Sequence, residues 1–271
     1  MSADTKALRL RIRSVDSTLH LTKAMELVAS SKIRRATASM QGGRKYANAV
    51  RDMISLLTRS KECQKSPYMQ EHAEGKTKLI VIAGDRGLAG GYNANIFKIA
   101  KEYEDADITA IGKRAFDRFK EGFDSAEHFT GKDAAAISKE VCEGFENGKF
   151  SRVGIISTEY VSMMTQNAKI EWILPLSKPE IKKSKEREAD IIFEPDEITI
   201  LNTAVFEYVT GIISAYVKES FACEVAARRV AMDSAGKNAQ QMIDTLQISY
   251  NRARQGAITQ EITEIVAGSG T

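Results

Sequence analysis

The segment GDRGLAGGYN at residues 84–93 contains the residue types best suited to chemistry in this chain. It follows a short apolar run and precedes a helical pattern, and a glycine-rich turn in that position can hold a phosphate on backbone N–H groups. No Gly-Lys-Ser/Thr follows it, and the glycines lack the G-x-G-x-x-G spacing. We therefore interpret it as a tight structural turn built on Gly84, Gly87, Gly90 and Gly91, with phosphate binding as the alternative. Gly87 is expected to have a positive φ angle.

Other residues that could act as nucleophiles, acids or metal ligands are scattered along the chain. Glu261 and Glu264 lie three residues apart, which on a helix is typical of a solvated face. The cysteines have no CxxC spacing, which favours structural thiols in a reducing compartment, and the histidines lack metal-ligand spacing. These isolated residues are His20, His72, His128, Cys63, Cys142 and Cys223. The sequence therefore predicts no catalytic residue, no cofactor and no metal site.

The first part of the chain is patterned as one long helix. From residue 6 to 60 no proline occurs, and only Gly42-Gly43 weakens the helical pattern, at roughly 1 kcal/mol for each glycine relative to alanine. A helix of about 55 residues would be about 80 Å long, more than a globular core can cover. Apolar positions alternately four and three residues apart form a heptad seam. They are Leu8, Ile12, Val15, Leu19 and Thr22.

The last part of the chain has a similar pattern. After Pro195 no further proline occurs, and positions alternately four and three residues apart run through this part. They are Ala235, Ala239, Met242, Leu246, Ser249, Ala253, Gly256, Gln260 and Thr263. A pattern longer than about 25 residues indicates a coiled coil. Two such segments at opposite ends of one chain predict an antiparallel pair, and the small residues predict a close approach of the helices.

Between these helices, short β-branched runs alternate with helical patterns, which predicts a partly parallel α/β sheet. Strands are expected at 78–83, 108–112, 152–160, 169–174 and 190–193, and helices at 93–104, 113–121 and 132–147. The expected fold class is α/β, with a Rossmann-like domain inserted into a long antiparallel coiled coil of the N- and C-terminal helices. The expected segments are an N-terminal coiled-coil helix at 1–66, the α/β domain at 67–195 and a C-terminal coiled-coil helix at 196–271.

Composition and charge narrow the class of protein. Hydrophobic residues make up 43% of the chain and charged residues 28%, which is typical of a folded, soluble protein. The longest apolar run, 79–83, is far shorter than the roughly 20 residues of a membrane span. Residues 1–60 carry 12 Lys and Arg against 4 Asp and Glu, within an overall charge of +3. Such a basic helix could bind an acidic protein surface, an anionic membrane or nucleic acid, although its single aromatic residue, Tyr46, weakens the nucleic-acid interpretation.

Three segments resemble the gamma subunits of F-type ATP synthases. The first is LRIRSVDSTLHLTKAMELVASSKIRRA at 10–36, and the second is the glycine turn at 84–93. The third extends from AARRVAMDSAGKNAQQMID through YNRARQGAITQEITEIV, within 226–266, and is the most specific. The resemblance follows the full length of the chain in order and spacing, with a weaker middle. The glycines at 42 and 43 depart from the pattern, because they fall inside a helix that should be continuous.

The resemblance implies the function of a central rotor shaft. Such a shaft couples ion translocation through the membrane sector to ATP synthesis or hydrolysis on the beta subunits, and it catalyses nothing itself. Its terminal helices would lie inside the hexameric ring of alpha and beta subunits, where the basic N-terminal helix would suit acidic segments of beta. Its α/β domain would grip the epsilon subunit and the membrane rotor ring of c subunits. The chain would thus be a peripheral membrane protein at the cytoplasmic face of the cell membrane.

The resemblance also implies partner-contact residues at matching motif positions. Met25 is expected to touch a lever segment of beta. The rotor-ring contact is expected around Phe193 and Glu194. The remaining expected contacts are Lys32, Arg228, Arg254, Gln255, Thr259 and Glu261.

Two other functions fit parts of the sequence. One is a nucleotide-dependent enzyme that uses the glycine turn, which would bind ATP or NAD as an isolated chain. The other is a nucleic-acid-binding coiled coil, whose DNA affinity would fall steeply with salt. A rotor shaft would bind no nucleic acid and would meet a membrane only through its complex.

Overall fold

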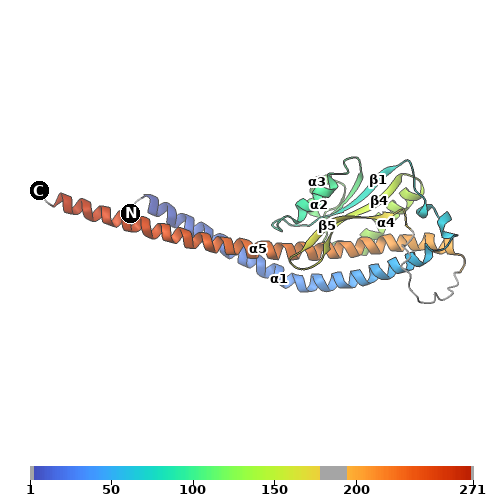
Figure 1. The fold of residues 1–271 in the computed structure, drawn as a ribbon, viewed down its shortest axis with the longest axis horizontal. Helices are drawn as coiled ribbons and strands as arrows, with labels where there is room; N and C mark the ends of the chain where they lie inside the picture. The colour runs from blue at the N-terminus through green and yellow to red at the C-terminus, as the bar shows by residue number, and fades with distance from the viewer. Residues whose placement is uncertain (1–2, 178–193, 270–271) are drawn as a thin grey trace. The chain divides into compact units, whose positions relative to one another are not determined.

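The computed structural model describes residues 3–177 and 194–269 of the chain (Figure 1). Its elements are, in order, α1 (Ala3–Leu57), η1 (Cys63–Lys65), η2 (Pro67–Met69), β1 (Lys76–Ile82), α2 (Tyr92–Ala100), β2 (Asp107–Ile111), α3 (Lys113–Phe119), β3 (Gly122–Phe123), α4 (Gly131–Glu146), β4 (Phe150–Tyr160), β5 (Gln166–Leu174) and α5 (Glu197–Gly268). The sequence predicted these elements except η1, η2 and β3, which are only two or three residues long. The strand expected at 190–193 lies outside the described residues.

Packing divides the chain into two compact units. Unit 1 lies within residues 1–31 and 228–271, and unit 2 lies within 32–227. Helices α1 and α5 each contribute to both units. The three-segment division of the sequence stays a prediction.

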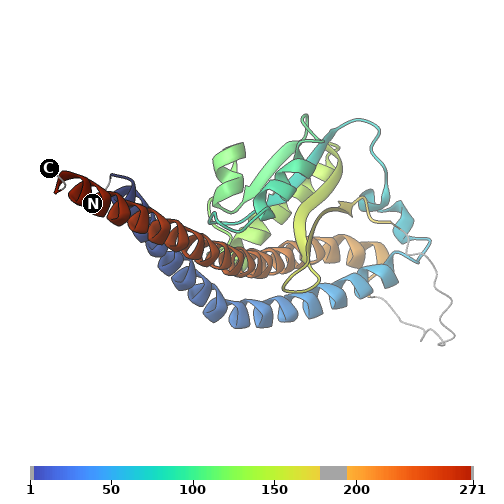
Figure 2. The same cartoon turned by 60° about the vertical axis from the view of Figure 1, so that its left-hand side comes forward.

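Unit 1 is an antiparallel pair of helices, which lie side by side in Figure 1 and again in Figure 2. The heptad seam predicted on α1 is confirmed, because its five residues are buried or half-buried and every residue between them is exposed. Small residues on α5 permit close packing against this seam. A Cβ built on Gly236 would lie 3.6 Å from Thr22 Oγ1 and 3.8 Å from Leu19 Cδ1.

The seam predicted on α5 is only partly right. Ala239, Leu246 and Ala253 are buried or half-buried, as expected. Each intervening position falls one residue later than predicted, so the spacing of four and three residues continues in the opposite order. The seam therefore uses Ile243, Tyr250 and Ala257, whereas Met242, Ser249 and Gly256 are exposed. The predicted seam positions Gln260 and Thr263 are exposed as well.

Unit 2 is built on a five-stranded sheet with the strand order β3-β2-β1-β4-β5. β1 pairs in parallel with β2 and β4, β3 extends the parallel part, and β5 pairs with β4 antiparallel. The predicted partly parallel sheet is therefore confirmed. β3 is only two residues long, and its Gly122 has a φ angle of 125° and lies so close to β2 that a Cβ there would be 2.1 Å from Ala110 O.

Helices cover both faces of the sheet (Figure 2). Alternate residues of a strand point to opposite faces. Ile80 and Ile82 of β1 belong to a core shared with α4 and with the unit 2 parts of α1 and α5. Leu79 and Val81 belong to a second core shared with α2 and α3. Burial on both faces explains why the central strand is a continuous apolar run rather than an alternating one.

Helix α5 is long and apolar enough to cross a membrane by length and composition. An 18-residue window of it reaches a mean hydropathy of 1.4, and half of that window is buried inside the structure. Buried apolar residues of α5 between Leu201 and Val217 belong to the core of unit 2. Packing in the core of unit 2 therefore explains why this stretch of α5 is apolar.

The Gly42-Gly43 pair does not interrupt α1, which is helical from Ala3 to Leu57. Gly43 is buried where α1 packs on α5, and a Cβ there would lie 3.3 Å from Ala215 Cα. Gly42 is exposed, and a Cβ there would meet nothing within 4 Å. Close helix packing therefore explains Gly43, whereas nothing in the structure explains Gly42.

Replacing Gly42 with alanine is expected to raise the free energy of unfolding by about 0.5–1 kcal/mol, because alanine has less backbone freedom to lose on folding and favours the helix. Gly43→Ala, one residue further along the same helix, is the matched control. It should gain less or lose stability, because its Cβ meets the backbone of α5. Urea unfolding of both variants measures the difference, and equal gains would contradict the close packing at Gly43.

Candidate functional site

The glycine turn lies between β1 and α2, at the carboxyl end of a central strand. Ligands of open α/β sheets bind at this edge. Positive φ angles occur at Leu88 (61°) and Gly90 (58°) but not at Gly87. The expectation of a positive φ at Gly87 is therefore wrong, because the chain reverses one residue later.

The backbone N–H groups at the start of the turn already have acceptors within the chain. Glu224 of α5, only 2% exposed, accepts the N–H of Asp85 (3.3 Å) and the N–H of Arg86 (3.0 Å). Asn93 Oδ1 accepts the N–H of Gly84 at 3.0 Å. A carboxylate of the chain itself thus accepts two of these donors, which favours the interpretation as a structural turn over phosphate binding.

The four turn glycines differ in what they contact. A Cβ on Gly84 would lie 2.7 Å from Glu224 Cδ, so this position has no room for a side chain while Glu224 is bound. A Cβ on Gly87 would meet only the far end of the Arg114 side chain, at 2.9 Å, and Gly91 has ordinary space. Gly84 is therefore required by the contact with α5, whereas the φ angle of Gly90 favours glycine without demanding it, since Leu88 has a similar angle.

Asp85 fastens the turn to two other segments. Its Oδ1 accepts the N–H of Lys113 (3.1 Å) and of Ala126 (2.7 Å). Its Oδ2 accepts the N–H of Glu127 (2.9 Å) and the hydroxyl of Ser125 (2.8 Å). Burial alone would raise the pKa of Asp85, but these four donors outweigh it and hold the pKa below its ordinary value. The ionised carboxylate therefore stabilises the folded unit.

Ion pairs continue outward from the turn. Glu127 Oε1 lies 2.6 Å from Lys32 Nζ of α1, and Glu127 Oε2 lies 3.8 Å from Arg86 Nη2. Lys32 was expected to contact a partner protein. Its ammonium is already bound to a carboxylate of unit 2, so a partner would have to share or replace that bond.

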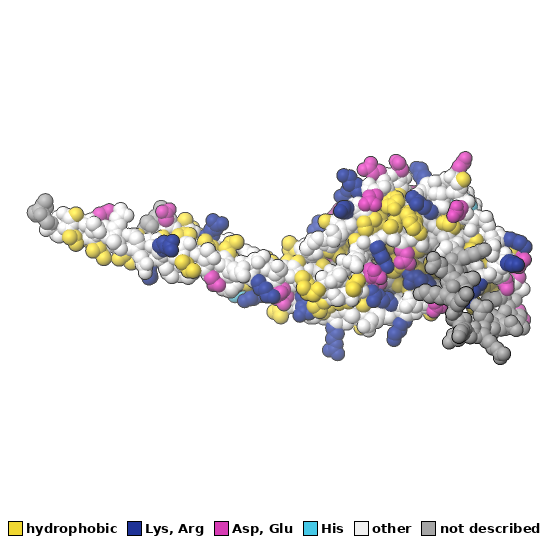
Figure 3. Space-filling model, in the orientation of Figure 1, with side chains coloured by type: hydrophobic (Ala, Val, Ile, Leu, Met, Phe, Trp, Pro, Cys, Tyr) yellow, Lys and Arg dark blue, Asp and Glu magenta, His cyan; other side chains and the backbone are white. Residues whose placement is uncertain are grey.

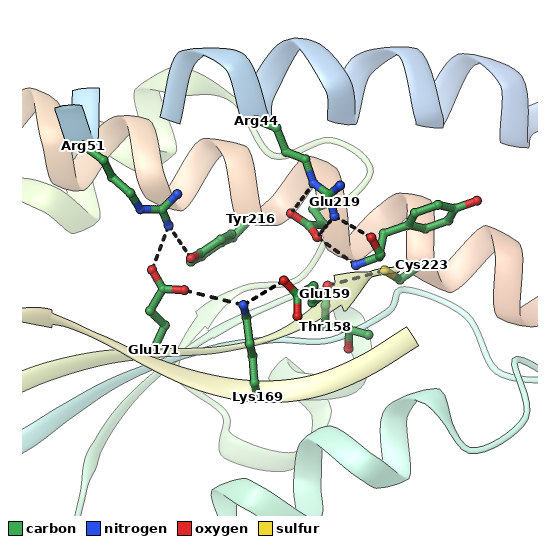
Figure 4. Close-up of polar contacts among 10 residues, drawn as sticks. Arg44, Arg51, Thr158, Glu159, Lys169, Glu171, Tyr216, Glu219 and Cys223 are labelled. Atoms are coloured by element: carbon green, nitrogen blue, oxygen red, sulfur yellow. Dashed lines mark hydrogen bonds and ion pairs between the residues drawn. The ribbon is translucent and has the colours of Figure 1, made fainter. Parts of the chain in front are cut away.

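A second buried carboxylate of α5 lies five residues before Glu224 (Figure 4). Glu219 accepts two bonds from the Arg44 guanidinium of α1, at 2.6 and 3.3 Å, and one from the N–H of Tyr160 at 2.8 Å. Arg44 also donates to the carbonyl of Tyr160 at 2.6 Å. The bond to Glu219 raises the pKa of Arg44, although burial opposes it. α1, α5 and the end of β4 are thus joined by one closed set of bonds.

A cleft of about 400 Å³ adjoins this set. Its charged side chains pair with one another, as Figure 4 shows. Arg51 donates to Glu171 (2.7 Å) and to the Tyr216 hydroxyl, and Lys169 lies 3.1 Å from Glu159. Because each charged residue lining the cleft has an opposite partner, the cleft offers no uncompensated charge to a ligand.

Most of the expected partner contacts lie in unit 1. Met25 is half-buried beside the seam of α1, and Arg228 is half-buried in α5. Nearer the end of α5, the expected contacts Arg254, Gln255, Thr259 and Glu261 are exposed. In unit 2, Glu194 is exposed, and Phe193 lies outside the described residues. None of those that the structure describes lines the cleft beside Glu219.

Apolar side chains are exposed along unit 1 (Figure 3). A solvated coiled coil normally presents polar residues outside its seam. The large apolar residues exposed here are Leu10, Leu21, Leu27 and Val28 on α1, and Met242, Ile248, Ile258, Ile262, Ile265 and Val266 on α5. An extended apolar surface of this kind indicates a protein partner.

The described residues offer little for metal or thiol chemistry. No group of three or more His, Cys, Asp or Glu among them could hold a metal ion. All three cysteines are free and buried. Burial raises the pKa of Cys142 to about 12 and the pKa of Cys63 above its ordinary value, so both remain protonated thiols at neutral pH.

Known proteins resemble the chain over its whole length. A family model described as ATP synthase matches residues 4–271. The ATP synthase gamma chain of Ruminococcus albus is 40% identical over 283 residues, covering 98% of both chains. The chain belongs to the ATP synthase gamma chain family. The sodium ion specific gamma chain of Acetobacterium woodii is 36% identical over 301 residues, covering 99% of both chains, so the resemblance expected from three motifs is confirmed.

Solved structures confirm the fold of this gamma chain. A chain of the Euglena gracilis mitochondrial ATP synthase OSCP/F1/c-ring structure gives a TM-score of 0.66 at 16% identity and covers 98% of this chain and 93% of its own. A chain of the Tetrahymena thermophila mitochondrial central stalk and c-ring gives 0.61 at 21% identity, covering 79% and 99%. At these identities the likeness concerns the fold alone.

Sequence reasoning missed the three carboxylates that hold this gamma chain together, Asp85, Glu219 and Glu224. A signal was present for the last two. Both interrupt a stretch of α5 that is otherwise apolar on most sides, and an acid in a buried stretch requires a donor. Which donors they meet depends on segments more than 50 residues away in sequence, such as Tyr160.

Gly84→Ala is expected to lower the free energy of unfolding by about 2–4 kcal/mol, because the new Cβ would displace Glu224 and leave a buried carboxylate without its donors. Gly87→Ala is the matched control and should cost less than about 1 kcal/mol, because only the end of a flexible arginine must move. Chemical denaturation of the two variants measures this. Equal costs would contradict the contact between Gly84 and Glu224.

Asp85→Asn is expected to cost about 1.5–3 kcal/mol at pH 7, because an amide replaces a carboxylate with four donors. A lowered pKa stabilises the fold above the unfolded pKa, near 4, and that contribution is lost as pH falls through the folded pKa. The cost of the substitution should therefore shrink below about pH 4. Denaturant unfolding at several pH values checks this, with the exposed Asp105→Asn as control. A cost independent of pH would count against an ionised Asp85.

Proposed function

We propose that the chain is the central rotor shaft of an F-type ATP synthase. The observation that carries this is the full-length match to ATP synthase gamma chains, on a chain whose paired helices expose an extended apolar surface. As a shaft it would couple ion translocation through the membrane sector to ATP synthesis or hydrolysis. It would be a non-catalytic subunit, with the chemistry on the beta subunits.

The two units would meet different partners. Unit 1 would lie inside the hexameric ring of alpha and beta subunits, where its exposed apolar residues and the positive charge of α1 would contact the ring. Unit 2 would bind the epsilon subunit and the rotor ring of c subunits. The chain would then be a peripheral membrane protein, held at the cytoplasmic face through its complex.

Coupling would follow from unequal contacts. Shifting a two-state site from 1:99 to 99:1 takes about 5.5 kcal/mol of differential contact energy. A shaft with different faces would present each beta subunit with different contacts, and rotation would exchange them. On α5, Arg228, Arg254, Gln255, Thr259 and Glu261 would supply such contacts. On unit 2, the segment of Phe193 and Glu194 would meet the rotor ring.

This function requires one copy of the chain per complex, against three copies each of alpha and beta, since several shafts could not present one asymmetric set of faces. Native mass measurement of the purified complex is expected to give this ratio. Membrane vesicles whose complex is assembled without the chain should show no ATP-driven ion pumping. Two copies per complex, or pumping without the chain, would refute the proposal.

Met25→Lys is expected to uncouple pumping from hydrolysis. Met25 is neutral and flexible, so it can slide past several arrangements of a neighbouring acidic segment. A lysine would add an attraction of about 1 kcal/mol at a solvent-exposed site, and more at a desolvated one. That attraction would lower the free energy of one rotary position and so raise the barrier to leaving it. The number of ions pumped per ATP should therefore fall, while assembly and hydrolysis largely survive.

The matched control for this test is Ala24→Lys, which adds the same charge at an exposed neighbouring position of α1. It should leave the ratio of ions to ATP unchanged. If Met25 serves only to pack the seam, Met25→Lys will lower assembly, hydrolysis and pumping together. That parallel loss would exclude a role for Met25 in coupling.

A further inference from the structure

The two buried carboxylates of α5 hold the same edge of the sheet. Glu219 accepts the N–H of Tyr160, the last residue of β4. Glu224 accepts the N–H groups of Asp85 and Arg86, which follow β1. β1 and β4 are neighbouring parallel strands, so these donors lie at the shared carboxyl edge. α5 is therefore fastened to backbone atoms at strand ends.

The two carboxylates project from different sides of α5. Successive helical residues are about 100° apart around the axis, so a separation of five residues corresponds to about 140°. Each bond lies away from the helix axis and so opposes rotation, and two such bonds about 140° apart fix the rotational setting of the helix more firmly than one. Between them, the Tyr92 hydroxyl of α2 donates to the carbonyl of Ser220 at 3.0 Å.

We propose that Glu219 and Glu224 form a torsional clamp, which passes torque between the sheet of unit 2 and the shaft helices. This inference rests on the rotor function proposed above. The hydrophobic effect that buries α5 is non-directional. Hydrogen bonds to a carboxylate are short, strong and directional, and burial keeps water from replacing them. The guanidinium of Arg44 extends the clamp to α1, because it binds Glu219 through two nitrogens.

Both residues act by holding α5, so they are positioning residues. Glu219→Gln and Glu224→Gln test this role with little change of size. A glutamine amide keeps one acceptor oxygen, but its NH₂ group would face a second N–H donor. The matched control is Glu207→Gln, which alters an exposed carboxylate on the same helix.

The experiment uses the whole ATP synthase complex reconstituted in lipid vesicles. Assembly, ATP hydrolysis, and ion pumping with and without an opposing ion gradient are measured for each variant. We expect normal assembly, normal hydrolysis and near-normal pumping without a gradient. Pumping against the gradient should fall in each single variant and fall further in the double variant, because the loosened junction yields only under torque. The Glu207 variant should match the wild type.

Two outcomes would overturn the clamp. If the variants pump against the gradient as fast as the wild type, the two carboxylates carry no torque. An equal loss of assembly, hydrolysis and pumping would mean that they only maintain the fold. Neither outcome would touch the rotor function, which fails if the complex holds two copies of the chain or if vesicles assembled without the chain still pump.

Amide hydrogen exchange in the assembled complex tests the contact itself. In Glu224→Gln, the Asp85 and Arg86 amides are expected to exchange about tenfold faster than in Glu207→Gln, as loss of a charge-assisted bond allows easier local opening. Unchanged exchange at these two amides would overturn the clamp at Glu224.

Discussion

The junction between the long helices and the sheet depends on buried carboxylates that accept backbone N–H groups. Glu224 accepts backbone N–H groups at the start of the glycine turn. Glu219 accepts the N–H at the end of β4 and the guanidinium of Arg44. A buried carboxylate without donors would be strongly unfavourable, so these contacts must form together with the fold. These contacts fix where α5 passes the sheet. The position of α5 in turn determines where the chain needs glycine, because Glu224 leaves no room for a side chain at Gly84.

The two units show two ways of stabilising one continuous helix. In unit 2, α5 is a core helix, with residues such as Val209 and Ile212 fully buried. In unit 1 the same helix contributes a narrow seam around Ala239 and leaves large apolar residues such as Ile265 exposed. The seam alone covers little surface, so these apolar residues remain available to a protein partner.

Much of the fold could be predicted from the sequence, because periodicity reports how each element is buried. The apolar run at 78–83 predicted a buried strand, and the seam from Leu8 to Thr22 predicted a partner helix. Where neighbours compete for one position, as Met242 and Ile243 do, the pattern alone could not choose, since both fit a spacing of three or four. Long-range polar contacts were harder still: Glu224 was visible as an acid in a buried stretch, but its donors lie about 140 residues away. The prediction of a positive φ angle at Gly87 was wrong, because the sequence did not show which residues of the turn reverse the chain; these are Leu88 and Gly90.

The carboxylate of Glu224 also has a metabolic consequence. The carboxyl edge of a parallel sheet is where many α/β proteins admit nucleotides, and a cell that makes ATP exposes every such edge to a large and changing pool of them. Here the N–H groups of Asp85 and Arg86 already donate to Glu224. A nucleotide that needed these two donors would have to displace a carboxylate of α5, so its binding would compete with the junction between the helix and the sheet.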